Sequence, residues 1–325
     1  MSILITGGAG FIGGWLAHNL AERGCEVDLL DDFSRGVKDT FIEGMLKTSG
    51  IRLIDRDLLK ADALNDLSDR YSTIYHLAAR VGVKNVIEEP YVTLCNNVLL
   101  VKQALELASR QGALDRFVFA STSEVYAGSL EHLQLPLPTP EDTPIALVDL
   151  DKPRSSYMMS KLYGEAMVRH AGVPFTILRP HNVYGPRMGM AHVIPELLKK
   201  AHEAPVGGEI EVFSTDHTRT FCFIDDAVEM FIAAAETPVC AGQVLNVGSQ
   251  APEITIGDLA QIIIGTIGKR LSVKSALATS GSPRRRCPDM SRMVDLTGLE
   301  TTIDLEEGIA QAYAWYSAEI LRKRP

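Results

Sequence analysis

Apolar and polar positions follow two different periods through the first half of the chain. Short runs rich in β-branched and large apolar residues predict strands over residues 2–6, 26–30, 51–55, 73–77, 116–121 and 174–178. Segments with helical periodicity fill most of the intervals. Because strands separated by amphipathic helices form βαβ units, the pattern predicts an α/β fold with a Rossmann-type, doubly wound parallel sheet.

The pattern loosens after about residue 179. Helices are predicted near residues 192–203, 224–236, 256–267 and 305–322, and short strands near 209–213 and 243–247. The proline-rich stretch at 135–144 cannot sustain a helix or a central strand, so a surface loop is expected there. We expect residues 1–178, completed by about 217–247, to form one domain. Residues 179–216 and 248–325 then form a smaller C-terminal α/β lobe.

Composition and charge restrict the possible partners. The chain has 325 residues, 46% of them hydrophobic and 22% charged, as in an ordinary globular protein. Its net charge of −9 disfavours nucleic acid and anionic membranes, so any bound anion must meet a local cluster of cations. The sequence contains no apolar run of membrane-spanning length and no cleavable leader pattern, and a cytoplasmic location is expected.

The five cysteines are widely spaced and include no C-x-x-C pair, which predicts reduced thiols rather than disulfides or a zinc site. His181 and the other histidines show no ligand spacing either, and they are expected to pack or to cap. No metal site is therefore predicted.

A glycine-rich turn follows the first predicted strand. Gly7, Gly10 and Gly13 form a G-x-x-G-x-x-G arrangement, with Phe11 and Ile12 at the start of an amphipathic segment that ends near residue 24. Glycines permit a tight turn and close backbone approach, while the helix N-terminus offers free N–H groups to a diphosphate. A glycine turn alone can be merely structural, but its position between a strand and a helix favours dinucleotide binding.

Acidic residues at the ends of the next two strands support this interpretation. Asp31 and Asp32 follow the glycines by about 20 residues, where a carboxylate can hold ribose hydroxyls. A carboxylate there would repel a 2′-phosphate, which favours NAD over NADP, although Arg35 and Lys38 follow closely. Asp57 is a further candidate at the adenine, with a solvated acid at a strand end as the alternative.

Tyr157 and Lys161 are four residues apart and therefore share one face of a predicted helix. A neighbouring ammonium and a positive nicotinamide would stabilise the tyrosine as phenolate, a base usable near neutral pH. Thr122, Ser123 and Glu124 follow another predicted strand, at the edge where doubly wound sheets bind ligands. The hydroxyls could simply cap the strand, whereas a buried acid needs a partner or a task.

These residues belong to a wider set of motifs spanning nearly the whole chain. The motifs are T-G-G-A-G-F-I-G at 6–13, H-L-A-A at 76–79, N-N-V at 96–98, S-T-S-E-V-Y at 121–126, Y-x-x-x-K at 157–161, N-V-Y-G-P-R-M at 182–188 and an R-x-F near 219. Together they resemble the extended short-chain dehydrogenase/reductases, in the branch of nucleotide-sugar epimerases, dehydratases and decarboxylases. The resemblance implies NAD as cofactor, with Leu77, Ala78, Ala79 and Asn97 also lining its site and His76 in the cofactor-side turn.

The resemblance also implies a shared opening step. Thr122 orients the sugar, Tyr157 takes the proton of the C4 hydroxyl, Lys161 supports Tyr157, and hydride passes to NAD. The resulting 4-keto group acidifies C5–H and would stabilise loss of a carboxylate from C6. The residues around C5 and C6 therefore decide the outcome.

Glu124 is the informative residue in this comparison. Family members that only invert C4 generally lack an acid at its position, whereas dehydratases and UDP-glucuronate decarboxylases carry one. Ser123 departs from the aspartate of dTDP-glucose 4,6-dehydratases, which puts that reaction in doubt. We expect a dehydratase or a decarboxylase acting at C5 and C6. The alternatives are a UDP-sugar 4-epimerase and a dinucleotide-binding protein without catalysis.

The substrate lobe must supply cations for the diphosphate of a nucleotide sugar, for which a UDP-sugar is favoured. Arg219 and Arg286 are the candidates, and R-R-R-C-P-D at 284–289 resembles the R-K-P-D segment of UDP-glucuronate decarboxylases. A basic triplet can also be a solvated loop. Asn182 and Arg187 are further candidates for substrate binding. The family usually forms homodimers through the helices that follow Pro90 and contain the catalytic tyrosine.

Overall fold

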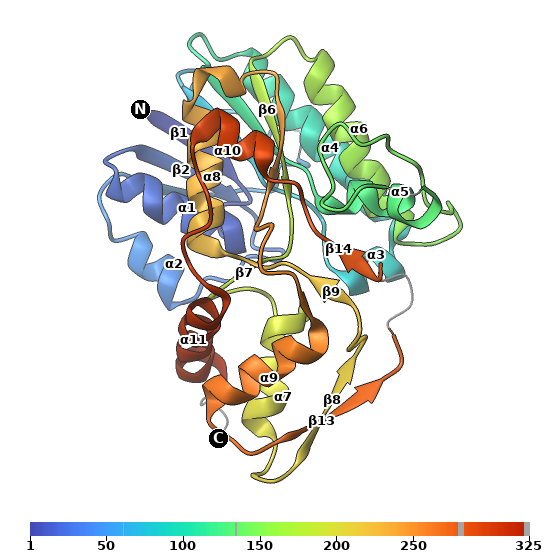
Figure 1. The fold of residues 1–325 in the computed structure, drawn as a ribbon. Helices are drawn as coiled ribbons and strands as arrows, with labels where there is room; N and C mark the ends of the chain where they lie inside the picture. The colour runs from blue at the N-terminus through green and yellow to red at the C-terminus, as the bar shows by residue number, and fades with distance from the viewer. Residues whose placement is uncertain (61, 134, 279–282, 322–325) are drawn as a thin grey trace.

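A seven-stranded parallel sheet forms the centre of the computed structural model, which describes residues 1–60, 62–133, 135–278 and 283–321 (Figure 1). In spatial order the strands are β11 (Val244–Val247), β6 (Phe175–Pro180), β5 (Arg116–Ala120), β4 (Thr73–His76), β1 (Ser2–Thr6), β2 (Glu26–Asp31) and β3 (Ile51–Asp55). The chain enters at β1, moves outward to β3, and then returns past β1 to build the other half. This is the doubly wound order, and the predicted fold class is confirmed.

Helices cover both faces of the sheet. The helices that contact strands of the sheet are α1 (Phe11–Glu22), α4 (Pro90–Ser109), α6 (Ser155–His170), α8 (Ile224–Glu236) and α10 (Ser291–Thr297). The shorter helices α2 (Thr40–Met45), α3 (Val83–Glu88) and α5 (Ala127–His132) come after β2, β4 and β5 in the chain. The helices α4 and α6 pack together on one face, and α1 and α8 pack together on the other (Figure 1).

The buried strand β5 illustrates why the sheet has two cores. Successive side chains of a strand point to opposite faces. Phe117 and Phe119 accordingly join the core under α4 and α6, whereas Val118 joins the core under α1 and α8. A strand buried on both faces reads as a continuous apolar run, which is the pattern that predicted it.

A smaller group of elements continues from the carboxyl edge of the sheet and lies below it in Figure 1. Its helices are α7 (Val193–Glu203), α9 (Ile256–Ile267) and α11 (Leu305–Tyr316). Its strands are β7 (Val183–Tyr184) paired with β10 (Cys222–Phe223), β9 (Thr218–Arg219) between β12 (Ile254–Thr255) and β14 (Arg285–Arg286), and β8 (Glu209–Phe213) paired with β13 (Ser272–Ala276). Short helical turns occur at η1 (Ser123–Tyr126), η2 (Pro238–Cys240) and η3 (Ser317–Leu321).

The predicted long elements agree with the structure to within one or two residues. The last predicted helix ends at Tyr316 and continues as η3, and its predicted terminus at residue 322 lies outside the described residues. The proline-rich stretch forms a loop, but its expected surface position is wrong in part. Thr139 and Glu141 are 2% and 7% exposed, because they bond to the segment around Cys287 and to the backbone of Asn246. Within the described ranges, no helix has the length and apolar character to cross a bilayer.

Candidate active site

The glycine-rich turn joins the end of β1 to the start of α1. Gly7 has a φ of +73°, and a Cβ at Gly13 would lie 2.3 Å from the carbonyl oxygen of Gly7, so both positions require glycine. Gly10 precedes the first helical turn, where the amide N–H groups of Phe11 and Ile12 find no hydrogen-bond partner among the described residues. Free amides at a helix N-terminus are suited to the diphosphate of a dinucleotide.

Asp31 is the predicted acid that contacts this turn. Its carboxylate accepts hydrogen bonds from the N–H of Ala9 at 3.0 Å and from the N–H two residues further on at 2.9 Å. Burial raises the pKa of Asp31, although both backbone donors act in the opposite direction. Asp32 is exposed and caps the following turn, and Asp57 accepts from the N–H two residues later at 2.9 Å. Of the three predicted acids, Asp31 is therefore the one that contacts the glycine-rich turn.

The carboxyl end of β4 packs against the glycine-rich turn. A Cβ at Gly7 would lie 2.7 Å from the backbone nitrogen of Ala78. Leu77, Ala78 and Ala79 are half-buried at this edge, so the structure brings the two predicted cofactor segments together.

Two further residues of this region bond to the protein itself. His76 lies within β4 rather than in the expected turn, with its Nδ1 at 2.8 Å from Oγ1 of Thr6. Asn97 is buried, and its side chain bonds to the backbone N–H and C=O of Arg80 and to Oγ of Ser160. Asn97 thus ties the segment after β4 to the helix that carries the predicted base.

Tyr157 and Lys161 project from the same face of α6, as their spacing predicts. The Nζ of Lys161 lies 5.9 Å from the centre of the Tyr157 ring and donates to the carbonyl oxygen of Ala120 at 2.7 Å. Lys161 is 4% exposed, and burial lowers its pKa to about 8, while the charge of Glu165 raises it. The ammonium is therefore the dominant form up to about pH 8.

The protein groups around Tyr157 favour the phenol over the phenolate. Burial raises the pKa of Tyr157 well above its usual value, and the charge of Glu124 adds to this. Hydrogen bonding to Thr122 and the charge of Arg35 lower the pKa, but by less. Desolvation therefore dominates for this buried hydroxyl, and the expected lowering of its pKa, which included the charge of the nicotinamide, is not produced by the protein groups without the cofactor.

The segment after β5 brings a carboxylate beside this pair. The Oγ1 of Thr122 accepts the backbone N–H of Glu124 at 3.2 Å and starts the short helix η1. Arg286 donates to Oε1 of Glu124 at 2.9 Å and lies 3.5 Å from Oγ of Ser123. The guanidinium of Arg286 lowers the pKa of Glu124, which remains a carboxylate at neutral pH.

Arg286 and Arg219 occupy paired positions on the neighbouring strands β14 and β9. Arg219 is 8% exposed and donates to backbone carbonyls of the adjoining segment at residues 283–284. Burial lowers its pKa to about 10, and the charge of Arg286 acts in the same direction. Arg154 adds a further positive charge near Glu124. The site therefore gathers three guanidinium groups around one carboxylate.

The other two predicted substrate residues lie elsewhere along this edge. Asn182 has a φ of +41° and donates to the carbonyl oxygen of Thr220 at 2.9 Å. Arg187 pairs with Asp39 at 2.7 Å and donates at 3.2 Å to the carbonyl oxygens of residues 9 and 10. These contacts place Arg187 against the glycine-rich turn, where it supports the backbone of the predicted cofactor site.

The sequence interpretation missed a buried ion pair beneath the site. Glu165 and Arg179 form a two-pronged pair with N···O distances of 2.9 and 2.7 Å, and their side chains are 6% and 4% exposed. Glu165 stands four residues after Lys161, so the helical spacing offered a signal. The partner Arg179 comes from β6 and could be found only from the fold.

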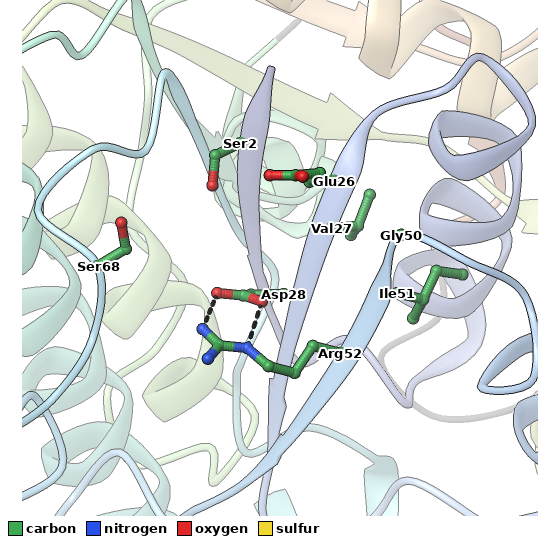
Figure 2. Close-up of a pocket in the computed structure, with 8 residues that line it drawn as sticks. All are labelled: Ser2, Glu26, Val27, Asp28, Gly50, Ile51, Arg52 and Ser68. Carbon is green, nitrogen blue, oxygen red and sulfur yellow. Dashed lines mark hydrogen bonds and ion pairs between the residues drawn. The ribbon is translucent and has the colours of Figure 1, made fainter.

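A separate cavity of about 430 Å³ lies at the opposite, amino edge of the sheet. Figure 2 shows Asp28 and Arg52 on its wall, joined to each other by two hydrogen bonds of 2.8 and 2.5 Å. The charges of these two residues are therefore matched. The cavity contains none of the predicted site residues.

Comparisons with known proteins place these features in a family. A model of the NAD dependent epimerase/dehydratase family matches residues 3–248. UDP-N-acetyl-alpha-D-glucosaminuronate decarboxylase of Bacillus cytotoxicus is 30% identical over 326 residues, covering 96% of this chain and 97% of the relative.

Solved structures agree over nearly the whole length. TunA, an NAD-dependent NDP-hexosamine 5,6-dehydratase of tunicamycin biosynthesis, is 30% identical with a TM-score of 0.82, covering 99% of each chain. UDP-glucuronic acid 4-epimerase of Bacillus cereus, in complex with UDP-glucuronic acid and NAD, is 29% identical with a TM-score of 0.81, covering 98% of this chain and 99% of the other. The resemblance predicted from the motifs is confirmed, and the chain belongs to the NAD dependent epimerase/dehydratase family.

Proposed function

We propose that the chain is an NAD-dependent nucleotide-sugar decarboxylase that acts on a UDP-uronate through a 4-keto sugar. The broader assignment, a dehydratase or decarboxylase of this family, agrees with the decarboxylase and dehydratase relatives. The finer assignment rests on one observation, the three guanidinium groups that surround Glu124.

The excess of positive charge favours a substrate with a second anionic group. Arg286, Arg154 and Arg219 contribute three positive charges near Glu124, and Glu124 and Glu253 are two acidic groups that act on this cluster. A diphosphate would interact with part of the positive charge. A C6 carboxylate would add a charged hydrogen-bond acceptor for the guanidinium groups, whereas a neutral C6 hydroxymethyl group would not.

The residues of α6 and η1 carry the first step of the proposed reaction. Thr122 orients the C4 hydroxyl, and the phenolate of Tyr157 removes its proton and becomes the phenol. Lys161 stabilises the phenolate before this transfer. The turn at Gly7–Gly13 and Asp31 would hold NAD, which supplies the two-electron oxidation of C4 and its later reversal when bound. Because the protein groups alone raise the pKa of Tyr157, the positive nicotinamide is a necessary part of this site.

The 4-keto group then permits loss of the carboxylate. The electron pair of the C5–C6 bond moves into the C4 carbonyl as carbon dioxide leaves, and a proton from water adds to C5. Arg286 holds the departing carboxylate, and ionised Glu124 fixes the orientation of Arg286. Return of hydride to C4 and of the proton from Tyr157 completes a UDP-pentose product.

Product analysis with matched substrates tests the proposal. The protein is incubated with NAD and either UDP-glucuronate or UDP-N-acetylglucosaminuronate, and in parallel with the corresponding C6 alcohols. Loss of carbon dioxide from a uronate, detected by mass spectrometry and abolished by Tyr157→Phe, is the expected result. Loss of water from a C6 alcohol would instead identify a dehydratase.

A uronate 4-epimerase is the second candidate, because the epimerase relative binds UDP-glucuronic acid and shares the fold. Its signature is a product of unchanged mass with inverted C4, resolved by chromatography. That outcome would overturn the decarboxylase assignment.

Assembly and location complete the proposal. We propose a homodimer through α4 and α6, where Tyr91, Leu99 and Tyr163 are 78%, 48% and 55% exposed. Exposed apolar side chains on packed neighbouring helices are typical of an interface between subunits. Light scattering would show whether the protein has the mass of a dimer.

All five cysteines are free thiols, which supports a reducing compartment and hence the cytoplasm.

We also propose the domain division given by the sequence. Residues 1–178 with about 217–247 form the NAD-binding domain, and residues 179–216 with 248–325 form the substrate-binding lobe. The pairing of β11 with β6 at the edge of the main sheet supports the return of the chain to the first domain.

A further inference from the structure

The buried pair of Glu165 and Arg179 lies directly behind the reacting groups. Glu165 follows Lys161 by one helical turn on α6, and Arg179 projects from β6. Both oxygens of Glu165 are engaged by Arg179, and Oε1 also accepts the hydroxyl of Ser121 at 2.6 Å. A bidentate pair with a third donor has little freedom to move.

The pair connects α6 to the end of β5. Ser121 precedes Thr122, so its bond to Glu165 fixes the start of the segment that carries Thr122 and Glu124. Lys161 donates to the carbonyl oxygen of Ala120, on the other side of the same strand end. Two bonds therefore join the end of β5, at Ala120 and the following Ser121, to successive turns of α6.

Arg179 extends the connection to the substrate side. It donates to the hydroxyl of Tyr126 at 2.7 Å and to the carbonyl oxygen of Glu141 at 3.0 Å. The Tyr126 hydroxyl donates in turn to Asn246 at 3.0 Å, and Asn246 also bonds to His181 at 3.0 Å. Glu165 is thus the inner end of a continuous, buried network.

Glu165 is the acidic group whose charge acts on Lys161. Burial lowers the pKa of Lys161, and Glu165 is the group that raises it. The titratable and charged groups that face Lys161 and Tyr157 from the packed elements are His76 of β4, Tyr157 and Glu165 of α6, Glu124 of η1, Arg35 after β2, and Arg179 of β6 behind Glu165.

We propose that Glu165, clamped by Arg179 and Ser121, is a positioning residue that keeps Lys161 as an ammonium ion and aligned with Thr122. The role of Glu165 in turnover rests on the proposed function, whereas the effect of Glu165 on the protonation of Lys161 does not. Glu165 is 5% exposed, and it acts through Lys161 and through its bond to Ser121 rather than as a reacting group.

The sign of the effect follows from the charges. Glu165→Gln removes a carboxylate and leaves Arg179 positive, so the pKa of Lys161 falls further below about 8. A lysine with a lowered folded-state pKa binds fewer protons than the unfolded chain in the interval between the two pKa values. Its contribution to stability therefore rises with pH across that interval, and the rise begins at the folded-state pKa.

A stability cycle measures this onset without any ligand. Urea unfolding is followed over a pH series for the wild type and Lys161→Met, each with and without Glu165→Gln. The difference in free energy of unfolding between the lysine and the methionine protein gives the contribution of Lys161 at each pH. We expect its pH-dependent rise to begin at a lower pH, by about one unit, when Glu165→Gln is present. An unchanged onset would overturn the proposal.

Two further variants test whether misfolding or a general loss of stability explains the result of the stability cycle. Glu165→Gln combined with Arg179→Met removes the charges of both members of the pair, and its onset should lie between those of the wild type and Glu165→Gln. Glu196→Gln is the matched control, since Glu196 pairs with Lys200 at the same helical spacing on the exposed side of α7. It should leave the onset unchanged.

The pH profile of turnover then tests the link to catalysis. With a uronate substrate, the alkaline limb of kcat should move to lower pH in Glu165→Gln and return in the charge-conserving Glu165→Asp. A purely structural role would lower kcat or Tm without moving the limb, which would contradict the proposal. If the wild type converts no uronate, the proposed function fails, while the stability cycle still decides the role of Glu165.

Discussion

Glu124 shows how a single side chain separates the possible outcomes of a shared first step. Its pair with Arg286 at 2.9 Å keeps it ionised, two residues after Thr122. In the proposed reaction this position would act near C5 and C6 of the sugar. Its side chain is 32% exposed, so its charge matters more to the site than to the fold.

Glu124→Gln should therefore reduce decarboxylation of a UDP-uronate by at least about 100-fold, because Arg286 loses the partner that orients it. The free energy of unfolding should change by no more than about 1 kcal/mol, since the residue is partly exposed. Product formation and urea unfolding are the measurements.

Glu253→Gln is the matched control for this prediction. Glu253 pairs with Arg285, the neighbour of Arg286 on β14, at 2.6 Å. This substitution should leave turnover near the wild-type level. An equal loss in both variants would mean that the strand, rather than the Glu124 charge, is responsible.

At the scale of elements, Arg187 joins the segment after β7 to the cofactor turn. Its side chain is 4% exposed, stacks 4.7 Å from the ring of Phe41, and bonds to Asp39 and to the carbonyl oxygens of the glycine turn. The backbone of the glycine-rich turn is therefore held by a side chain about 175 positions away in the sequence.

Arg187→Met should weaken NAD binding by about tenfold or more and lower the free energy of unfolding by about 1–3 kcal/mol, because Asp39 and two carbonyls lose their donors. Calorimetric titration with NAD checks the first effect. Arg23→Met removes an exposed pair with Glu229 and should alter both quantities little. Unchanged NAD affinity in Arg187→Met would show that the turn holds its shape unaided.

The long elements could be predicted because buried strands and amphipathic helices leave clear periodic patterns. The strands β7, β9, β10, β12 and β14 are two residues long, and no period can be recognised in two residues. Their pairing nevertheless decides the site, because β9 and β14 bring Arg219 beside Arg286. The two arginines are close because of the register between segments about 67 residues apart in the sequence. The local sequence pattern carries no information about that register.

Some residues of the site can likewise be placed from local sequence pattern, and others cannot. Tyr157, Lys161 and Thr122 could be found because helical spacing and a strand end define their places. Arg187 could not be placed correctly, because its partners are distant in the sequence. The pKa of Tyr157 could not be predicted from the sequence either, because it depends more on burial than on neighbouring charges.

For the whole molecule, two buried histidines govern the response to acid. His76 and His181 are 0% and 1% exposed, and burial lowers the pKa of each to about 3. The unfolded chain binds these protons below about pH 6.5, whereas the folded protein binds them only near pH 3. Stability is therefore lost as the pH falls through this interval.

Each histidine should contribute about 2 kcal/mol of lost stability by about pH 5. Urea unfolding at about pH 7.5 and pH 5 measures the loss, which should be smaller in His76→Asn. His170→Asn, at an exposed position on α6, is the control and should retain the full loss. An identical acid response in His76→Asn and the wild type would contradict this account.

The paired positions of Arg219 and Arg286 have a consequence for how the lobe responds to its ligand. Two like charges on adjacent strands repel each other, as the effect of Arg286 on Arg219 indicates. An arriving dianion acts as their shared counter-ion and removes this repulsion. A bound dianion should therefore stabilise the pairing of β9 with β14, and added salt should weaken this stabilisation by screening the charges.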